Sequence, residues 1–364
     1  MMRRTCATAD VIIALAMLNH FSLPAAALAL VASSYWVSGG AHAAEAPALY
    51  RITQSIPLGS PDGWDYLTYD AASQRVYVAH GSAIDVLDAR SGKVLGHVPV
   101  PGANGVVVVP AIGKGYAGSR AAKAAVVFDL NTFKVLKTLP ADADTDAVVY
   151  DPYSKRVFIM DGDPHNITVI DTITDSLVAT VPLDGQPEFG AVDGAGKLFV
   201  NITDKKEIQR IDTVSAKVDA TWPIGECEGP HGLSIDPQSR RLFASCVNAK
   251  LLVVNSTNGE VVSVMPIGKG SDATAFDGVR KRAFSSNREG TLSVIHEDGA
   301  DRFTSLGEVP TQLLARTMAL DPVSGRIYLV AADRVEVDAA AADPRKRYSI
   351  VPGSVRLLFA DPLT

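Results

Sequence analysis

The sequence predicts an all-β chain that folds as a single seven-bladed β-propeller of four-stranded antiparallel blades, because two columns of residues repeat seven times. The first column follows a buried run and is an aspartate in all units but one: Asp70, Pro110, Asp151, Asp193, Asp236, Asp277 and Asp321, at intervals of 40 to 44 residues. The second column is aromatic and lies in the next strand: Tyr77, Tyr116, Phe158, Phe199, Phe243, Phe284 and Tyr328. Four short strands in a unit of about 42 residues are typical of a propeller blade.

The third unit shows the strands of one blade most clearly. Residues 147–150 form a buried run, 151–155 contain turn-forming residues, and 156–160 form a second strand. Residues 167–171 alternate as a half-buried strand does, and 176–181 return after another turn. A length of 364 residues would allow several domains, but the repeats account for it with one ring.

The two ends of the repeat region are expected to close the ring. The last unit has strands near 317–320, 326–330 and 354–359, and lacks a fourth. Residues 49–57 form a surplus strand, which we expect to become the outer strand of blade seven and so to remove an open sheet edge. An insertion at 332–351, alanine-rich and then basic, predicts a surface loop or, alternatively, a flap over the channel or a partner contact.

The first 43 residues have the features of an export signal. Arg3 and Arg4 precede a stretch, 11–44, that contains no Asp, Glu, Lys or Arg, and Ala41-His42-Ala43 fits the small residues that signal peptidase recognises. We expect residues 1–43 to be removed, residues 44–364 to form the propeller, and the mature protein to be periplasmic or secreted without a membrane span. An uncleaved anchor is the alternative, because the apolar stretch is long enough to cross a bilayer.

Charge and cysteine content narrow the classes of function. The chain has 40 acidic and 34 basic residues and a net charge of −6, so we expect no nucleic-acid partner. Loss of Cys6 with the signal would leave Cys227 and Cys246, which we expect to form a disulfide in an oxidising compartment. Two buried free thiols are the alternative. We expect the protein to be a monomer.

Several segments resemble a known family. Residues 167–185 (ITVIDTITDSLVATVPLDG) are similar to the YVTN-type repeat of exported bacterial seven-bladed propellers, the YncE-like proteins. Residues 75–78 (RVYV) and 197–201 (KLFVN) resemble the strand that names the repeat. Residues 226–232 (ECEGPHG) with 242–246 (LFASC) resemble a recurrent blade of the family, and 352–356 (PGSVR) resemble its C-terminal ending. The resemblance implies the propeller fold and a secreted or periplasmic binding protein without a shared catalytic motif.

Candidate functional residues lie five positions before each member of the first column, where the innermost strands start. In blade order they are Asp65, Gly105 or its neighbour Asn104, Asp146, Glu188, His231, Asp272 and Arg316. This end of the strands belongs to the face that carries the loops between blades, the funnel face, where propellers usually bind ligands. We therefore predict a binding or interaction module for a small ligand or a protein partner. Acidic loop residues such as Glu226 and Glu228 would favour a cationic ligand or a basic partner surface.

Three interpretations of these residues stay open. In the first, they line a hydrated channel and compensate one another, because Arg316 lies between Asp272 and Asp65 in blade order. In the second, four of them bind a divalent metal: Asp146, Glu188, His231 and Asp272. Carboxylates suit Ca²⁺, whereas a histidine favours a transition metal. In the third, His231 and Glu188 are catalytic residues of a metal-dependent hydrolase or lyase.

Overall fold

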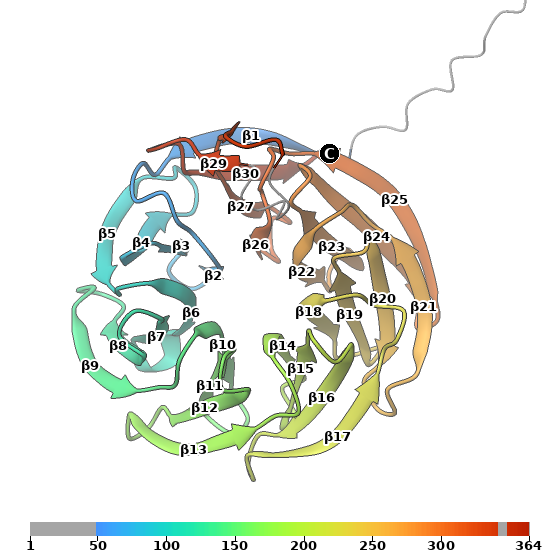
Figure 1. The fold of residues 1–364 in the computed structure, drawn as a ribbon, viewed down its shortest axis with the longest axis horizontal. Helices are drawn as coiled ribbons and strands as arrows, with labels where there is room; N and C mark the ends of the chain where they lie inside the picture. Colours follow the sequence, from blue (N-terminus) through green and yellow to red (C-terminus); the bar gives the residue numbers. More distant parts are fainter. Residues whose placement is uncertain (1–48, 341–347, 364) are drawn as a thin grey trace, which may run out of the picture. The chain divides into compact units, whose positions relative to one another are not determined.

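The computed structural model describes residues 49–340 and 348–363, and seven four-stranded antiparallel sheets stand around a central axis in this part of the chain (Figure 1). The predicted all-β propeller and its number of blades are confirmed. The described residues include no helix with the length and apolar character that a membrane crossing requires. The segment predicted as a signal, 1–43, lies outside them.

Each blade contributes four strands, counted from the axis outward. The innermost strands are β2 (Leu67–Asp70), β6 (Ala103–Val109), β10 (Thr145–Asp151), β14 (Pro187–Val192), β18 (Pro230–Asp236), β22 (Ser271–Asp277) and β26 (Thr317–Leu320). The second strands are β3 (Arg75–His80), β7 (Lys114–Ser119), β11 (Arg156–Asp161), β15 (Lys197–Ile202), β19 (Arg241–Cys246), β23 (Arg282–Asn287) and β27 (Ile327–Ala331). The third strands are β4 (Ala83–Asp88), β8 (Ala124–Asp129), β12 (Asn166–Asp171), β16 (Glu207–Asp212), β20 (Lys250–Asn255), β24 (Thr291–Gly299) and β30 (Arg356–Pro362). The outer strands are β5 (Val94–Pro99), β9 (Val135–Pro140), β13 (Ser176–Pro182), β17 (Lys217–Pro223), β21 (Val261–Pro266), β25 (Arg302–Pro310) and β1 (Tyr50–Pro57).

The ring closes through its two ends, as predicted. Strand β1 is the outer strand of the seventh blade and pairs antiparallel with β30, from Tyr50 opposite Pro362 to Pro57 opposite Arg356. The innermost strands of the first and last blades, β2 and β26, are also in contact. The first strand of the described chain therefore covers the edge that the last blade would otherwise expose.

The hydrophobic core lies between the blades. The described residues form seven buried clusters, and each combines side chains of two neighbouring blades. The cluster of blades three and four also includes Tyr66, which comes from blade one. The repeated aromatic residue of every blade is at most 2% exposed and packs toward the next blade; Phe158, for example, packs with Leu198 and Val200. Because successive strand residues point to opposite faces, each blade contributes to two clusters.

The repeated aspartate column closes a turn in each blade but one. Six members accept hydrogen bonds of 2.7–3.2 Å from the backbone amide two residues ahead: Asp70, Asp151, Asp193, Asp236, Asp277 and Asp321. In blade two the prediction of Pro110 is wrong by one residue, because Val109 pairs with Lys114 as Asp151 pairs with Arg156. Pro110 instead begins the 3-10 helix η1 (Pro110–Ile112), and the amide of Gly113 donates to its carbonyl oxygen at 3.0 Å.

The insertion in the last blade is partly regular. Strands β28 (Arg334–Glu336) and β29 (Tyr348–Ile350) form an antiparallel hairpin, in which the guanidinium of Arg334 lies 4.0 Å from the centre of the Tyr348 ring. After the hairpin, the amide of Gly353 donates to Asp62 Oδ1 at 2.6 Å. The expected loop therefore contains a hairpin, and this contact ties the chain after it to the β1–β2 connection.

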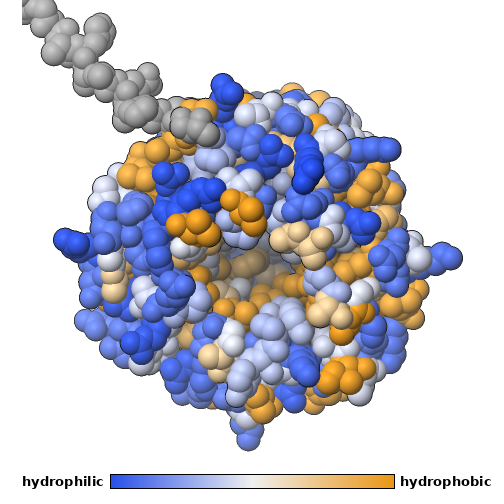
Figure 2. Space-filling model, turned by 180° about the vertical axis from the view of Figure 1, so that it is seen from behind, coloured by the Kyte–Doolittle hydropathy of each residue, from blue (hydrophilic) through white to orange (hydrophobic). Residues whose placement is uncertain are grey.

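The centre of the ring is hollowed on the face opposite to that of Figure 1. Figure 2 shows apolar residues in the wall of this hollow, whereas polar residues dominate much of the outer rim. The predicted functional residues lie at the starts of the innermost strands that surround the axis (Figure 1).

Candidate functional site

β-Bulges place most of the predicted residues where they can meet near the axis. In five innermost strands the pairing shifts just after the first paired residue, and the next residue is Asn104, Asp146, Glu188, His231 or Asp272. A bulge redirects side chains out of the regular alternation, which would otherwise bury them between blades. Asp65 and Arg316 lie just before β2 and β26. We call these seven residues the channel ring; Asn104, rather than Gly105, is its member in blade two.

Two arginines bind Asp272, whose side chain is only 2% exposed. Arg316 Nη1 lies 2.5 Å from Asp272 Oδ2 and 3.7 Å from Asp65 Oδ1, so Arg316 connects the two carboxylates as its position in blade order suggested. Arg288 donates from Nη2 to Asp272 Oδ1 at 2.9 Å. Burial would raise the pKa of Asp272, but the charges of Arg316 and Arg288 outweigh it and lower this pKa to about 2. Sequence reasoning missed Arg288, which follows the end of β23 and lies outside the repeated column.

His231, Glu188 and Asp272 form the tightest group of potential ligands in the ring. His231 Nε2 lies 4.0 Å from Glu188 Oε1 and 4.0 Å from Asp272 Oδ1, and the three ligand atoms lie within 4.8 Å of one another. His231 Nδ1 lies 2.8 Å from the carbonyl oxygen of Gly229. Because a carbonyl oxygen can only accept, Nδ1 carries the proton of the neutral imidazole, and Nε2 is an acceptor that faces both carboxyl groups.

Tyr66 crosses the centre of the ring at this level. It belongs to blade one, but its hydroxyl donates to Glu188 Oε1 of blade four at 3.1 Å, and its ring centre lies 5.0 Å from that of Phe189. Tyr66 is only 5% exposed. The centre is therefore partly filled by a side chain. Only its position beside Asp65 could have drawn attention to Tyr66.

Asp146 lies apart from the arginines and accepts one long hydrogen bond, 3.4 Å, from Asn104 Nδ2. Burial raises the pKa of Asp146 well above its usual range, and the charge of Glu188 adds to this effect. Burial, with the charge of Asp272, also raises the pKa of Glu188 to about 8. Burial raises the pKa of Asp65 to about 6, although Arg316 opposes the shift. At neutral pH, Glu188 therefore holds a proton, and burial favours the protonated form of Asp146 as well.

The four residues predicted as metal ligands are only partly brought together. Ligand atoms of Glu188, His231 and Asp272 lie within 4.8 Å of one another. Among the described residues, Asp146 does not belong to this group. Two guanidinium groups already bind Asp272, and their charges would oppose a metal ion at that carboxylate. One nitrogen with two oxygens suits a transition metal, whereas Ca²⁺ would need more oxygen ligands than this group supplies.

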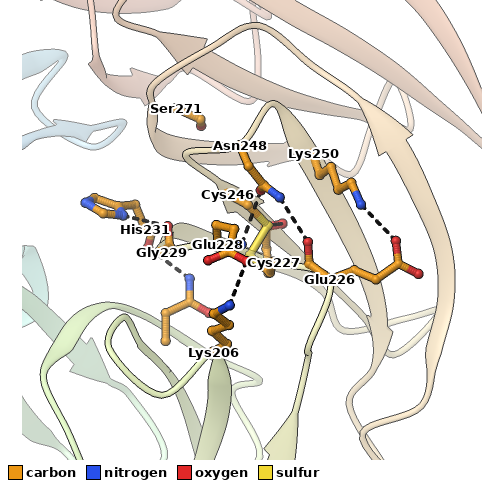
Figure 3. The surroundings of a disulfide bond; sticks show 12 residues. Lys206, Glu226, Cys227, Glu228, Gly229, His231, Cys246, Asn248, Lys250 and Ser271 are labelled. Carbon is orange, nitrogen blue, oxygen red and sulfur yellow. Dashed lines mark hydrogen bonds and ion pairs between the residues drawn. A yellow bond between two sulfur atoms is a disulfide. The ribbon is translucent and has the colours of Figure 1, made fainter.

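The predicted disulfide between Cys227 and Cys246 is present, with Cα atoms 5.3 Å apart (Figure 3). It joins the turn before β18 to the end of β19, and both cysteines are fully buried. The same turn includes Gly229, whose carbonyl oxygen orients His231, and the amide of Val247 donates to the carbonyl oxygen of Glu228 at 3.0 Å. The disulfide therefore anchors the turn that fixes the His231 imidazole.

The acidic residues beside this disulfide are paired with lysines. Lys250 Nζ lies 2.9 Å from Glu226 Oε2, and Lys206 Nζ lies 2.6 Å from Glu228 Oε1 (Figure 3). The lysines compensate part of the negative charge by which these glutamates were expected to favour a cationic ligand or partner. In the channel ring, by contrast, Asp146 and Glu188 form no ion pair with a lysine or arginine among the described residues.

A pocket of about 380 Å³ includes one ring residue and is lined by Asp62, Gly63, Trp64, Arg288, Leu314, Arg316 and Ile350. Arg316 donates to the Trp64 carbonyl oxygen at 2.9 Å, and its guanidinium lies 5.6 Å from the centre of the Trp64 ring. Ile350 is the last residue of β29, so the hairpin of the insertion forms part of the pocket wall. The insertion thus borders the predicted site, as the flap alternative requires.

Comparisons with known proteins extend the description of the fold. No model of a protein family matches the chain, and no curated protein sequence does. The chain is similar in structure to a chain of Kuenenia stuttgartiensis hydrazine synthase, with a TM-score of 0.65, 16% identity, and coverage of 82% of this chain and 96% of the other. It is also similar to a chain in a mitotic checkpoint complex, with a TM-score of 0.68, 15% identity, and coverage of 85% and 93%. At such identities the likeness shows the propeller fold alone.

Proposed function

We propose that the chain is an exported binding protein, periplasmic or secreted, in which a small ligand or a protein partner engages the channel ring at the funnel face. Residues 1–43 and the resemblance to YVTN-type repeats support export. The disulfide adds support, because disulfides persist mainly in oxidising compartments. The propeller fold is compatible with an interaction module.

The charge balance of the ring is the observation that carries the binding proposal. Four ring carboxyl groups face two guanidinium groups, and both guanidinium groups contact the same carboxylate, Asp272. Asp146 and Glu188 have no such partner, and burial raises their pKa values, which favours protons on both groups. A cationic ligand could replace those protons, and we therefore favour a positively charged ligand, or a positively charged group of a partner, over an anion.

Thermal unfolding with charged probes tests this proposal. Near pH 7, spermidine should raise the melting temperature of the wild-type protein, whereas citrate should not. The double variant Asp146→Asn/Glu188→Gln should lose the response to spermidine. Glu207→Gln is the matched control, because Glu207 belongs to the same blade as Glu188 but lies outside the ring. An equal response of the wild-type protein and the double variant would contradict the proposal, as would stabilisation by citrate alone.

The second candidate function is a metal-dependent hydrolase or lyase, in which His231 acts in acid–base chemistry beside a metal-binding Glu188. The meeting of Glu188, His231 and Asp272 favours it, and the two arginines on Asp272 weigh against it. Equilibrium dialysis against Zn²⁺ and against Ca²⁺ separates it from the binding proposal. Stoichiometric metal that is lost in both His231→Ala and Glu188→Ala would support the enzyme, and no bound metal would exclude it.

A further inference from the structure

We infer that His231, Glu188 and Asp272 form the binding site for a primary ammonium group, R–NH₃⁺. This inference rests on the proposed cation-binding function of the channel ring and names the chemistry of the cation. It depends on three features of the described residues: the spacing of the acceptor atoms, the fixed orientation of the histidine, and the charge around them.

The spacing of the three acceptors is compatible with an ammonium nitrogen and is wider than tetrahedral zinc requires. His231 Nε2 lies 4.0 Å from an oxygen of each carboxyl group, and all three atoms lie within 4.8 Å of one another. A tetrahedral nitrogen that donates three hydrogen bonds of about 2.8 Å places its acceptors about 4.6 Å apart. Zn²⁺ with bonds of about 2.1 Å would need tetrahedral ligands about 3.4 Å apart. The 4.0 Å pairs would therefore widen by about 0.6 Å around an ammonium and contract by about 0.6 Å around zinc.

All three atoms can accept a hydrogen bond from such a ligand. The bond of His231 Nδ1 to the Gly229 carbonyl oxygen leaves Nε2 as an acceptor, and no described side chain comes within hydrogen-bond distance of this nitrogen. Asp272 Oδ1 accepts a hydrogen bond from Arg288 and keeps a second lone pair for the ligand. Glu188 Oε1 accepts a hydrogen bond from the Tyr66 hydroxyl and also keeps a second lone pair. Three acceptors match the three N–H donors of R–NH₃⁺, whereas a quaternary ammonium offers none.

The formal charges of the ring leave room for this cation. Arg316 and Arg288 bind Asp272 from its other sides, with N–O distances of 2.5 and 2.9 Å. Because Glu188 holds a proton at neutral pH, an ammonium that displaces this proton leaves the net charge of the group unchanged. Tyr66 and the Asp272 side chain, 5% and 2% exposed, keep water from much of the site and strengthen these contacts.

The surroundings provide a place for the group that carries the nitrogen. Arg288 and Arg316, which contact Asp272, also line the pocket of about 380 Å³ that includes Trp64, Leu314 and Ile350. An alkyl chain attached to the ammonium could lie against these apolar surfaces. Both a free alkylamine and the lysine side chain of a partner protein have this chemistry.

Calorimetric titration of the whole protein with matched probes tests the inference. The probes are n-butylamine, butyltrimethylammonium, the peptide Gly-Lys-Gly with blocked ends, and ZnCl₂. We expect n-butylamine to bind at least tenfold more tightly than butyltrimethylammonium. We expect Glu188→Gln to weaken the binding of n-butylamine at least tenfold. Glu207→Gln should change its affinity less than twofold. The ¹⁵N resonance of His231 Nε2 in the wild-type protein should shift on saturation, which gives a readout that does not depend on a variant.

The outcomes separate this inference from the proposed function. Selective binding of n-butylamine with the His231 shift supports a free amine as ligand, and tighter binding of the peptide supports the lysine of a partner. Equal binding of the quaternary probe would overturn the ammonium inference and leave a cation-binding ring. Stoichiometric Zn²⁺ that depends on Glu188 would overturn it in favour of the metal enzyme. If no cationic probe binds, both the inference and the proposed function fail.

Discussion

Each innermost strand starts at a channel-ring residue and ends, in most blades, at a turn aspartate, and these two ends differ in how their charges are satisfied. At the turn end, Asp151 accepts bonds of 3.2 and 3.0 Å from amides two and three residues ahead, and Asp277 does the same at 2.9 and 3.0 Å. At the ring end, Asp272 depends on Arg316, which is 44 residues away in another blade. The backbone bonds of the turn end are therefore formed within one blade, although Lys281 of the next blade also binds Asp236 at 2.9 Å. The contact between Arg316 and Asp272 at the ring end requires two assembled blades.

This difference explains why the two ends vary differently between blades. A turn aspartate meets the same local backbone in each unit, so the same residue type serves six of the seven blades. The ring positions share one environment around the axis, and they carry five residue types: Asp, Asn, Glu, His and Arg. Repetition at the turn end reflects stability, and diversity at the ring end allows a site with several kinds of donor and acceptor. Four predictions test this contrast.

The largest effect is expected at a repeated core position. Phe158 is fully buried between blades three and four, so Phe158→Ala should lower the free energy of unfolding by about 3–5 kcal/mol through lost burial and a cavity. Chemical denaturation measures the loss. A cost below about 1 kcal/mol would mean that the repeated aromatic column does not carry the blade contacts.

The disulfide is expected to serve both stability and the ring. The double variant Cys227→Ala/Cys246→Ala opens a loop with a sequence separation of 19, and chain entropy predicts a loss of about 3 kcal/mol. The ring nitrogens of His231 should also change their NMR resonances, because the turn with Gly229 loses its anchor. Unchanged His231 resonances would show that the turn is held without the disulfide.

A smaller effect is expected at a turn aspartate. Asp151→Ala removes its bonds to the amides of Tyr153 and Ser154, and we expect a loss of about 1–2 kcal/mol in denaturant unfolding. Binding at the ring should not change, because the turn lies at the other end of β10. A change in ring affinity larger than the change in stability would remove the distinction between the two ends.

The last prediction concerns Glu188, and its effect on stability depends on pH and has the opposite sign. Because burial raises the pKa of Glu188 from 4.5 to about 8, the folded chain holds a proton that the unfolded chain releases between these pH values. The free energy of unfolding should therefore fall as the pH rises through this range. Glu188→Gln removes this dependence, and the variant should be more stable than the wild type above pH 8 and equal to it below pH 4.5. Parallel pH profiles of the two proteins would contradict the raised pKa.

The sequence predicted those features that follow from the repeat. The blade number, the closing strand and the positions of the ring residues all come from one period, because each blade repeats the same local structure. The disulfide followed instead from two cysteines in a chain expected to be exported. Tyr66 and Arg288 could not be found in this way, since Tyr66 reaches Glu188 of blade four from blade one and Arg288 lies outside the column. Pro110 was misplaced because a valine occupies the position of the turn aspartate in blade two.

Strand β1 is among the first parts of the ring to be made, and its partner β30 is among the last. Thr53 Oγ1 donates to the carbonyl oxygen of Phe359, 306 residues later, at 3.3 Å. At about 5–20 residues per second, a ribosome needs about 15–60 s to cover that distance. For this time a nascent chain holds β1 without its neighbour, and a stalled chain should be cut by protease within residues 50–57. A fusion partner that slows release of the C-terminus would prolong this vulnerable interval.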